Sequence, residues 1–367
     1  MQRLLQIFVL IGFLSGFSAC SIVDDMLLTE EVGDFSRSVV ALSAIITKEF
    51  SLAEEVNTIG FTDNLRFQLE LGGNPDTDLK PLFNASDIAA RQSLLSGLNG
   101  YVETLAAVAS GKSLSSEYAE LAGTAENLKL VSAESFNLTH SLSLLESNQL
   151  VNDLSLFDKL FILPERDKRL LPIVEKGGTA LKKMAVLLYF DMGAVSDQSS
   201  KCSYTYPKNN LDADMSSLRL CKGGLRSIVS NAISFDTNIW KDKLSYMKAQ
   251  GKDTATERNA AIERLVSIQK LGQSMDKLLN ETQTTLIAMV KAHETLEVTL
   301  QDAGKSSSPP VSATVSSLLF HGKLRGLLET MATVQAALAP LSGSPTTSRD
   351  FKSMTFPQTA SGESDDK

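Results

Sequence analysis

Residues Thr254 to Ala303 read TATERNAAIERLVSIQKLGQSMDKLLNETQTTLIAMVKAHETLEVTLQDA. Apolar side chains recur along this stretch about every 3.5 residues, which is the period of a left-handed coiled seam. The residues of this seam are Ile262, Leu265, Ile268, Leu271, Met275, Leu278, Thr282, Leu286, Met289, His293, Leu296 and Leu300. The pattern predicts a helix of about 50 residues, which at 1.5 Å per residue is roughly 75 Å long. A helix of that length indicates an elongated body.

Other segments of the chain also carry apolar residues at helical spacing, between residues that start or stop helices. Together with the seam, the predicted helices cover residues 24–60, 86–110, 115–163, 166–195, 211–248, 254–303 and 311–338. Gly60, Gly111 and Pro164 are the expected ends of the first three helices, and Pro340 follows the last. Where connections are short, neighbouring helices are expected to run antiparallel.

These helices predict an all-α fold, an elongated antiparallel helical bundle over residues 20–341 with long coiled-coil-like helices. The sequence leaves open whether they form one bundle or two, divided near Pro164 or near the loop that holds Cys202. At most a small β arm is expected, because apolar residues alternate within residues 61–83, a pattern equally consistent with an irregular connection. Residues 342–367 are rich in Gly, Ser, Pro, Thr and Asp, which predicts a disordered tail.

Composition supports a folded chain and argues against one class of partner. Hydrophobic residues make up 43% of the 367 residues, enough to build a core, whereas aromatic residues make up only 6%. Such a mixture favours helices packed by aliphatic side chains over sheets. The net charge is -8, and no segment offers the basic face that binding to phosphates requires. No nucleic-acid partner is therefore expected.

The amino terminus, MQRLLQIFVLIGFLSGFSAC from Met1 to Cys20, has the layout of a secretory signal peptide. Arg3 precedes an apolar run that is shorter than an ordinary membrane-spanning helix. Phe17, Ser18, Ala19 and Cys20 resemble the lipobox of bacterial lipoproteins, with Phe17 in the place where that family favours Leu. The resemblance implies that residues 1–19 are removed and that Cys20 carries the lipid. Cleavage after Ser18 by the ordinary signal peptidase is the alternative.

The resemblance also implies an address in the cell. Ser21 follows Cys20, and the absence of Asp at that place resembles lipoproteins that are exported to the outer membrane. We therefore expect a lipid-anchored protein of the bacterial cell envelope, attached to the outer membrane and facing the periplasm. No second apolar run approaches the length of a membrane span, so no further membrane segment is expected.

Two cysteines remain apart from the lipidation candidate. Cys202 lies in a predicted loop over residues 196–210, and Cys221 lies in the early turns of the predicted helix 211–248. In an oxidising compartment, two cysteines this close in sequence favour a disulfide. A Cys202–Cys221 bridge would hold the loop against the helix and contribute about 3 kcal/mol to stability.

The sequence offers no recognisable catalytic, metal or cofactor site. Its three histidines have no nucleophile in a G-x-S-x-G turn beside them. His293 and Glu294 begin like the zinc motif H-E-x-x-H, but residue 297 is Glu. His293 and Glu297 do share a helix face, so a metal contact is one alternative. The favoured interpretation is a buried polar residue that fixes the register of the seam.

The function expected from these observations is binding without catalysis. An anchor, long helices and the absence of catalytic motifs favour a non-enzymatic scaffold or protein-binding bundle, held at the membrane by lipid on Cys20. The alternative is a carrier whose bundle core holds a lipid or another apolar small molecule.

Overall fold

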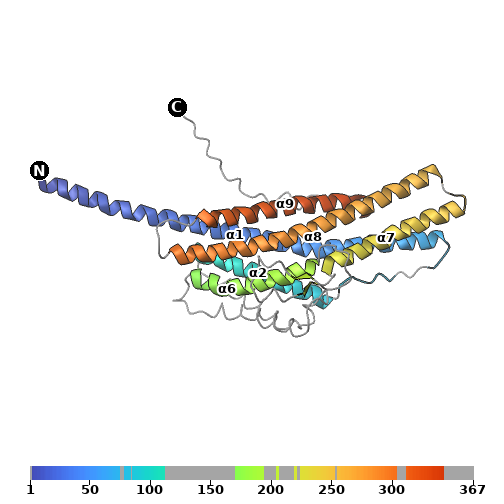
Figure 1. The fold of residues 1–367 in the computed structure, drawn as a ribbon, viewed down its shortest axis with the longest axis horizontal. Coiled ribbons are helices and arrows are strands. Elements are labelled where there is room, and N and C mark those ends of the chain that lie inside the picture. Colours follow the sequence, from blue (N-terminus) through green and yellow to red (C-terminus); the bar gives the residue numbers. More distant parts are fainter. Residues whose placement is uncertain are drawn as a thin grey trace, which may run out of the picture.

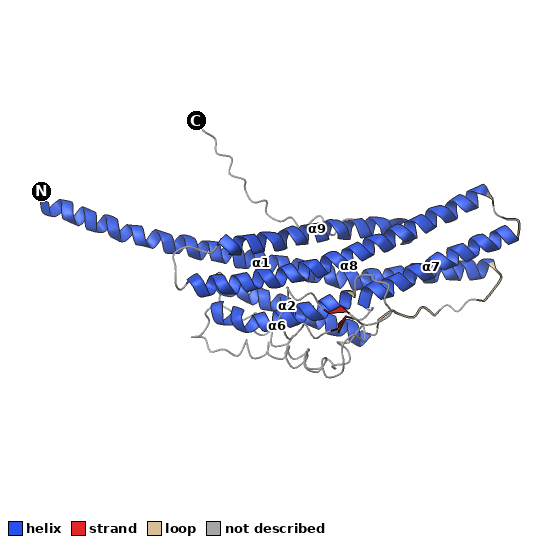
Figure 2. Ribbon diagram, in the orientation of Figure 1, coloured by secondary structure: helices blue, strands red, loops and turns tan. Residues whose placement is uncertain are grey.

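The computed structural model describes residues 2–74, 78–83, 85–111, 170–193, 204–205, 219–220, 224–252, 254–303 and 311–342. The helices are α1 (Gln2–Glu70), α2 (Ala85–Ala109), α6 (Leu170–Met192), α7 (Gly224–Ala249), α8 (Ala255–Ala303) and α9 (Val311–Ser342). Two short strands, β1 (Tyr204–Thr205) and β2 (Arg219–Leu220), pair antiparallel. The predicted all-α fold is thus confirmed (Figure 2).

The helices form an elongated bundle arranged around α8 (Figure 1). Helix α8 packs against α9, α6, α7 and α1, and α1 also packs against α2, α7 and α9. Helices α1 and α8 run in opposite directions along the body, while α6 and α7 follow one another along its length (Figure 1). Buried apolar residues from all six helices belong to one continuous core, so the helices that the structure describes form a single bundle.

The predicted long helix is confirmed as α8, and its start is fixed by a capping box. The hydroxyl of Thr254 accepts a hydrogen bond from the backbone N–H of Glu257 (3.2 Å), and the Glu257 carboxylate accepts one from the backbone N–H of Thr254 (3.1 Å). Most of the seam is buried as expected, from Ile268 to Leu296. Leu265 and Leu300 are half-buried, and Ile262 is exposed over 52% of its surface.

The predicted end of the first helix at Gly60, and the β arm considered after it, are wrong. Helix α1 continues to Glu70. Gly60 lies inside the helix, and a glycine is found there because α7 packs closely against it. A Cβ at position 60 would lie 3.3 Å from Cβ of Asp236. The alternating apolar residues are the last turns of α1, and Leu69 among them is 63% exposed. Gly72, with φ of 75°, follows the end of the helix.

Two further boundaries differ from the prediction. Helix α7 begins at Gly224, and residues 219–220 before it form strand β2, so the predicted helix does not run continuously from residue 211. At Gly224 the chain lies in contact with α6. A Cβ there would lie 2.4 Å from the carbonyl oxygen of Asp191, and φ is 71°, so the position requires glycine. Helix α9 continues past Pro340 to Ser342. Arg264 on α8 binds the carbonyl oxygen of Leu341 at 3.0 Å and so satisfies the helix end.

The other predicted helices fare differently. The prediction of a helix at residues 86–110 is confirmed by α2, and that at 166–195 is confirmed in its main part by α6. The predicted helix at residues 115–163 lies outside the described residues, as do all but the first residue of the predicted disordered tail, 342–367.

Candidate functional site

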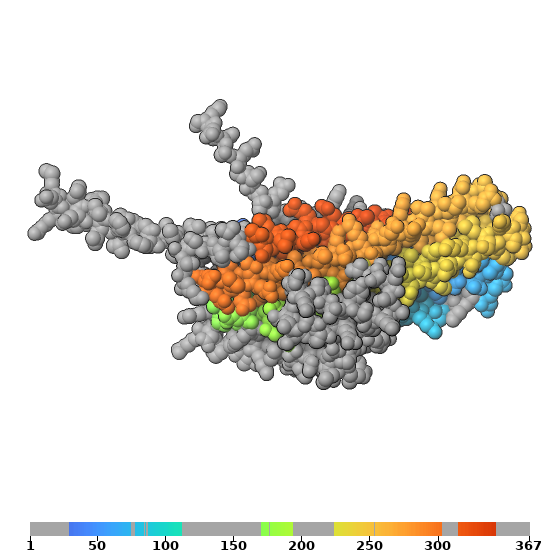
Figure 3. Space-filling model, in the orientation of Figure 1, coloured from blue at the N-terminus to red at the C-terminus, as the bar shows by residue number. Residues whose placement is uncertain are grey.

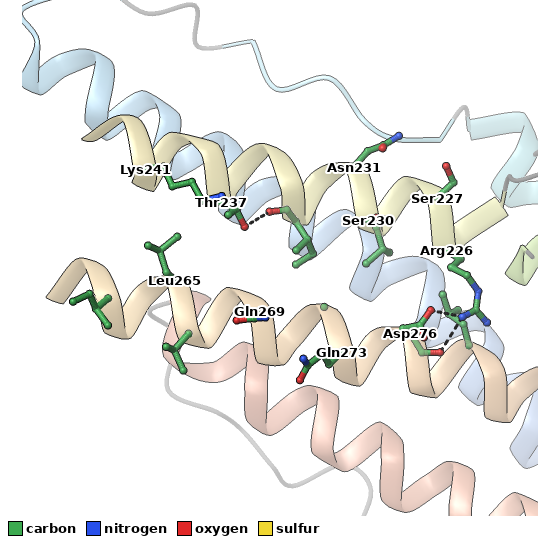
Figure 4. Close-up of a pocket in the computed structure, with 16 residues that line it drawn as sticks. Arg226, Ser227, Ser230, Asn231, Thr237, Lys241, Leu265, Gln269, Gln273 and Asp276 are labelled. Carbon is green, nitrogen blue, oxygen red and sulfur yellow. Dashed lines mark hydrogen bonds and ion pairs between the residues drawn. The ribbon is translucent and has the colours of Figure 1, made fainter. Parts of the chain in front are cut away.

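An open groove of about 1040 Å³ lies between α7 and α8 (Figure 4). Its apolar lining comes from both helices: Val229 and Ile233 on α7, and Ile262, Leu265, Val266 and Leu279 on α8. Polar side chains, among them Ser230, Asn231, Gln269 and Gln273, also border it. The groove therefore has an apolar floor and polar margins, which is the composition of a binding surface.

The groove follows the helix axes. Along α7 it extends from Arg226 to Lys241, a distance of about 22 Å, or four turns, at 1.5 Å per residue. The two helices approach each other closely at Gly272 on α8, where a Cβ would lie 3.2 Å from Cγ2 of Ile233 on α7. In Figure 4 Leu265 points across the groove toward Lys241. Two exposed aliphatic residues, Ile262 (52%) and Val266 (44%), leave apolar surface open to a partner at this end.

Arg226 closes one end of the groove with a fixed set of contacts. Its side chain is only 7% exposed and forms an ion pair with Asp276. Its second guanidinium nitrogen lies 3.3 Å from Oε1 of Gln283. The amide of Gln283 in turn donates to the carbonyl oxygens of Tyr189 (3.0 Å) and Gly193 (2.8 Å). This end of the groove is thereby tied to the end of α6.

At the other end, a buried polar cluster joins four helices. The carboxylate of Asp63 on α1 accepts hydrogen bonds from Nε1 of Trp240 on α7 (2.7 Å) and from Nη2 of Arg264 on α8 (2.6 Å). Arg264 also binds the last turn of α9. Burial and the neighbouring Asp63 raise the pKa of Asp236 to about 7. The cluster fixes the spacing of α7 and α8 beside Lys241 and Leu265.

A second buried polar contact lies in the core, away from the groove. Nε2 of His293 lies 2.6 Å from the phenolic oxygen of Tyr101, and both residues are at most 1% exposed. Burial, with the charge of Lys182 nearby, lowers the pKa of His293 to about 3, so its ring is neutral at physiological pH. The prediction that His293 is a buried polar residue on the seam is confirmed.

Glu49 on α1 is a buried carboxyl group with one hydrogen bond from the described residues. Thr282 on α8 donates a hydrogen bond to its Oε1, while no described residue contacts its Oε2 as a hydrogen-bond partner. Burial raises the pKa of Glu49 to about 8, an effect that the bond from Thr282 only partly opposes. At neutral pH the protonated, uncharged form is therefore favoured in the folded protein.

None of the cysteines predicted from sequence as sites is among the residues that line the groove in the described part of the chain. Cys20 falls within α1, in a part of the helix whose side chains are not described. Cys202 and Cys221 both lie outside the described residues. The sequence pattern does not predict the groove, because it places Ile262 in the buried seam and Val266 off it. An off-seam valine beside an exposed end of the seam is the signal that would have indicated it.

Comparison with known proteins adds no relative. No family model matches the chain, and neither a curated protein nor a solved structure is significantly similar to it.

Across the part of the chain that the structure describes, no helix is long and apolar enough to cross a membrane. Within the same residues, no three His, Cys, Asp or Glu side chains come together as metal ligands would.

Proposed function

We propose that the protein is an envelope lipoprotein, anchored by lipid on Cys20, whose helical bundle binds a protein partner in the α7–α8 groove. The geometry of the groove carries this proposal. Its length of about four helical turns, its apolar floor and its open side suit one amphipathic helix with apolar residues at positions i, i+3, i+4 and i+7. Lys241 at one end favours an acidic residue on that helix. The role is non-enzymatic.

The anchor would hold the bundle close to the membrane. Helix α1 runs without interruption from Cys20 into the body, and Val32 is its first buried residue among those described. Those twelve residues span about 18 Å as a helix. After cleavage before Cys20, the lipid would therefore sit on a short rigid arm, at the outer membrane and facing the periplasm.

Site-specific photocrosslinking in cells tests the groove. A photoreactive amino acid replaces Val266 in the full-length protein, and a matched sample carries it at Val298, an equally exposed valine on α8 (44% and 47%) outside the groove. We expect a discrete protein adduct at position 266 that is absent at 298 and is lost when Ile262→Asp is added. Equal labelling at both positions would exclude the groove as the binding site.

Mass spectrometry of the processed amino terminus tests the anchor separately. Acyl chains on Cys20 are the expected result, because one chain binds a membrane only weakly and lipoproteins of this kind carry several. An unmodified amino terminus at Ala19 would show ordinary cleavage after Ser18 instead.

The alternative function, a carrier of a lipid or another apolar molecule, receives less support from the packing. A cavity of about 120 Å³ between α1 and α2 is smaller than the roughly 300–1,000 Å³ that small-molecule sites occupy. The α7–α8 groove has the volume for a lipid, but it is open along its length. Native mass spectrometry that finds a lipid bound to the purified protein, and lost in the Ile262→Asp variant, would favour the carrier.

A further inference from the structure

The outer face of α9 exposes large apolar side chains near the start of that helix. Val315 is 59% exposed, Leu318 is 61% exposed and Leu319 is 52% exposed. The opposite side of α9 packs against α8 and α1. Figure 3 shows α9, in red-orange, along the upper edge of the molecule. These three side chains lie within five residues of one helix and so form one contiguous apolar patch, unlike the singly scattered apolar residues of an ordinary surface.

The same face continues to the end of α9, where glycine and alanine are its commonest residues. A Cβ added at Gly322 or at Gly326 would meet no atom within 4 Å, so the space outside both is open in the described structure. We call the following set the α9 outer face: Val315, Leu318, Leu319, Gly322, Gly326, Glu329, Thr333, Ala336, Ala337 and Pro340. Two of them, Gly326 and Ala337, are half-buried, and Ala337 at the edge of the face also contacts the core. Apart from the adjacent pairs 318–319 and 336–337, these residues follow one another at intervals of three and four and therefore share one side of the helix. From first to last they extend over about 38 Å.

We propose that the α9 outer face packs against the same face of a second copy of this chain, with the two helices antiparallel. The two-fold axis would pass between Gly326 and Glu329. In this register the opposed pairs, one residue from each copy, are Val315 with Pro340, Leu318 with Ala337, Leu319 with Ala336, Gly322 with Thr333, and Gly326 with Glu329. A two-fold interface of this kind uses one self-complementary patch twice.

Complementarity of size favours this arrangement over a parallel one. The two leucines lie in the first half of the face and the two alanines in the second half, while Gly322 and Gly326 are opposed to the larger Thr333 and Glu329. An antiparallel pair sets each leucine against an alanine, so that the helices approach at an even distance along their length. A parallel pair would oppose leucine with leucine at one end and glycine with glycine in the middle, leaving a gap.

Charge complementarity favours the same arrangement. Arg325 and Glu329 are both exposed on α9. About the proposed axis, Arg325 of one copy lies beside Glu329 of the other, which is attractive, and this contact occurs twice. In a parallel pair, Arg325 would lie beside Arg325 of the second copy, which is repulsive. A membrane surface would cover the aliphatic half of the face but would oppose Glu329, so it fits the whole face less well.

The dimer leaves the α7–α8 groove accessible. Helices α7 and α9 lie on opposite sides of α8 around the groove (Figure 4). The inference therefore rests neither on the proposed partner nor on the lipid. If both Cys20 residues carry lipid, the two amino-terminal arms point in opposite directions and the paired rods lie along the membrane.

Disulfide crosslinking of the full-length protein in bacterial cells tests the register. The Leu319→Cys/Ala336→Cys variant should give a crosslinked dimer on a non-reducing gel, and Leu319→Cys alone should give none. Positions 319 and 336 of one helix are about 25 Å apart, far beyond the reach of a disulfide within the chain. A dimer formed equally by Leu319→Cys alone would overturn the antiparallel register, and no dimer in either variant would overturn the interface.

Charge reversal in the same Cys pair background tests the electrostatic contact. We expect Glu329→Arg to lower the crosslinking yield about five-fold, and we expect the Arg325→Glu/Glu329→Arg double change to restore it. Ile262→Asp, which alters the groove and not α9, serves as the matched control and should leave the yield unchanged. A yield that is insensitive to charge reversal, or that falls equally with Ile262→Asp, would refute the proposed contact.

Discussion

The phenolic oxygen of Tyr101 on α2 lies 2.6 Å from Nε2 of His293 on α8, inside the core of the bundle. Helix α6 crosses directly over this pair. A Cβ at Gly177 would lie 2.2 Å from Cε2 of Tyr101, and one at Gly178 would lie 3.1 Å from Cε1 of His293. The two glycines let the backbone of α6 rest on the two rings. The hydrogen bond thus fixes the stagger of three helices at one level of the bundle.

Gly177→Ala should destabilise the protein by about 1–3 kcal/mol, because the added methyl group overlaps the Tyr101 ring. The overlap involves the ring body and not a flexible chain end, so the core must shift to relieve it. The free energy of unfolding, measured by denaturant titration with circular dichroism, is the readout.

Gly33→Ala is the matched control for that experiment. Gly33 also lies inside a helix, but the nearest atom to an added Cβ is Nη1 of Arg37 at 3.5 Å, an ordinary contact. Here alanine should stabilise the helix by about 0.5–1 kcal/mol through lower backbone entropy in the unfolded chain. Equal effects at positions 33 and 177 would show that close packing against Tyr101 is not what matters.

These glycines illustrate which features can be predicted from the sequence and which depend on the packing of the helices. Apolar spacing predicted α2, α6 and α8 and the burial of His293, because amphipathic periodicity is a local property of the chain. It read Gly60 as a helix end, although the close approach of α7 explains that glycine. Close approaches, like the Asp63, Trp240 and Arg264 cluster, depend on which helices become neighbours. The exposure of Ile262 depends on the same information, so the off-seam Val266 alone is too weak a signal to predict the groove.

Glu49→Gln should remove a pH dependence of stability. The pKa of Glu49 is raised from 4.5 to about 8 in the folded protein. The folded state therefore holds a proton that the unfolded state has released between pH 4.5 and 8, and the stability of the native protein falls as pH rises through that window. The slope from this group approaches about 1.4 kcal/mol per pH unit. Glutamine resembles the protonated acid and cannot ionise.

The measurement is the difference in the free energy of unfolding between wild type and Glu49→Gln, at pH values from 5 to 9. We expect this difference to move in favour of the variant as pH rises. His293 acts in the opposite direction, because its folded pKa of about 3 lies below 6.5 and so stability is lost as pH falls from 6.5 to 3. Its effect is common to both proteins and cancels in the difference. Parallel curves would contradict the burial of an ionisable Glu49.

Arg264 and Arg66 both approach Asp63, but only Arg264 should matter for stability. Arg264 lies 2.6 Å from the carboxylate with 15% of its side chain exposed, whereas Arg66 lies 3.6 Å away and is 69% exposed. Arg264→Met should cost about 3 kcal/mol, because it leaves the buried Asp63 without its main counter-charge and frees the end of α9. Arg66→Met should cost less than about 0.5 kcal/mol. Comparable losses in thermal or denaturant unfolding would disprove this ranking.

The pairing of strands β1 and β2 brings together the two chain segments next to Cys202 and Cys221, so we keep the prediction of a disulfide between these cysteines. Tyr204 pairs with Leu220 and Thr205 with Arg219, so the chain two residues after Cys202 lies against the chain directly before Cys221. Peptide mapping without reduction should recover one linked peptide that contains both cysteines, and alkylation should find no free thiol at either. Cys202→Ser/Cys221→Ser should lower the free energy of unfolding by about 3 kcal/mol, because the unfolded chain regains the freedom of a short loop. Reduction of the wild type should lower its free energy of unfolding by the same amount, and reduction of the double variant should leave its free energy of unfolding unchanged. If both thiols of the unreduced wild type react with the alkylating reagent, no bridge forms.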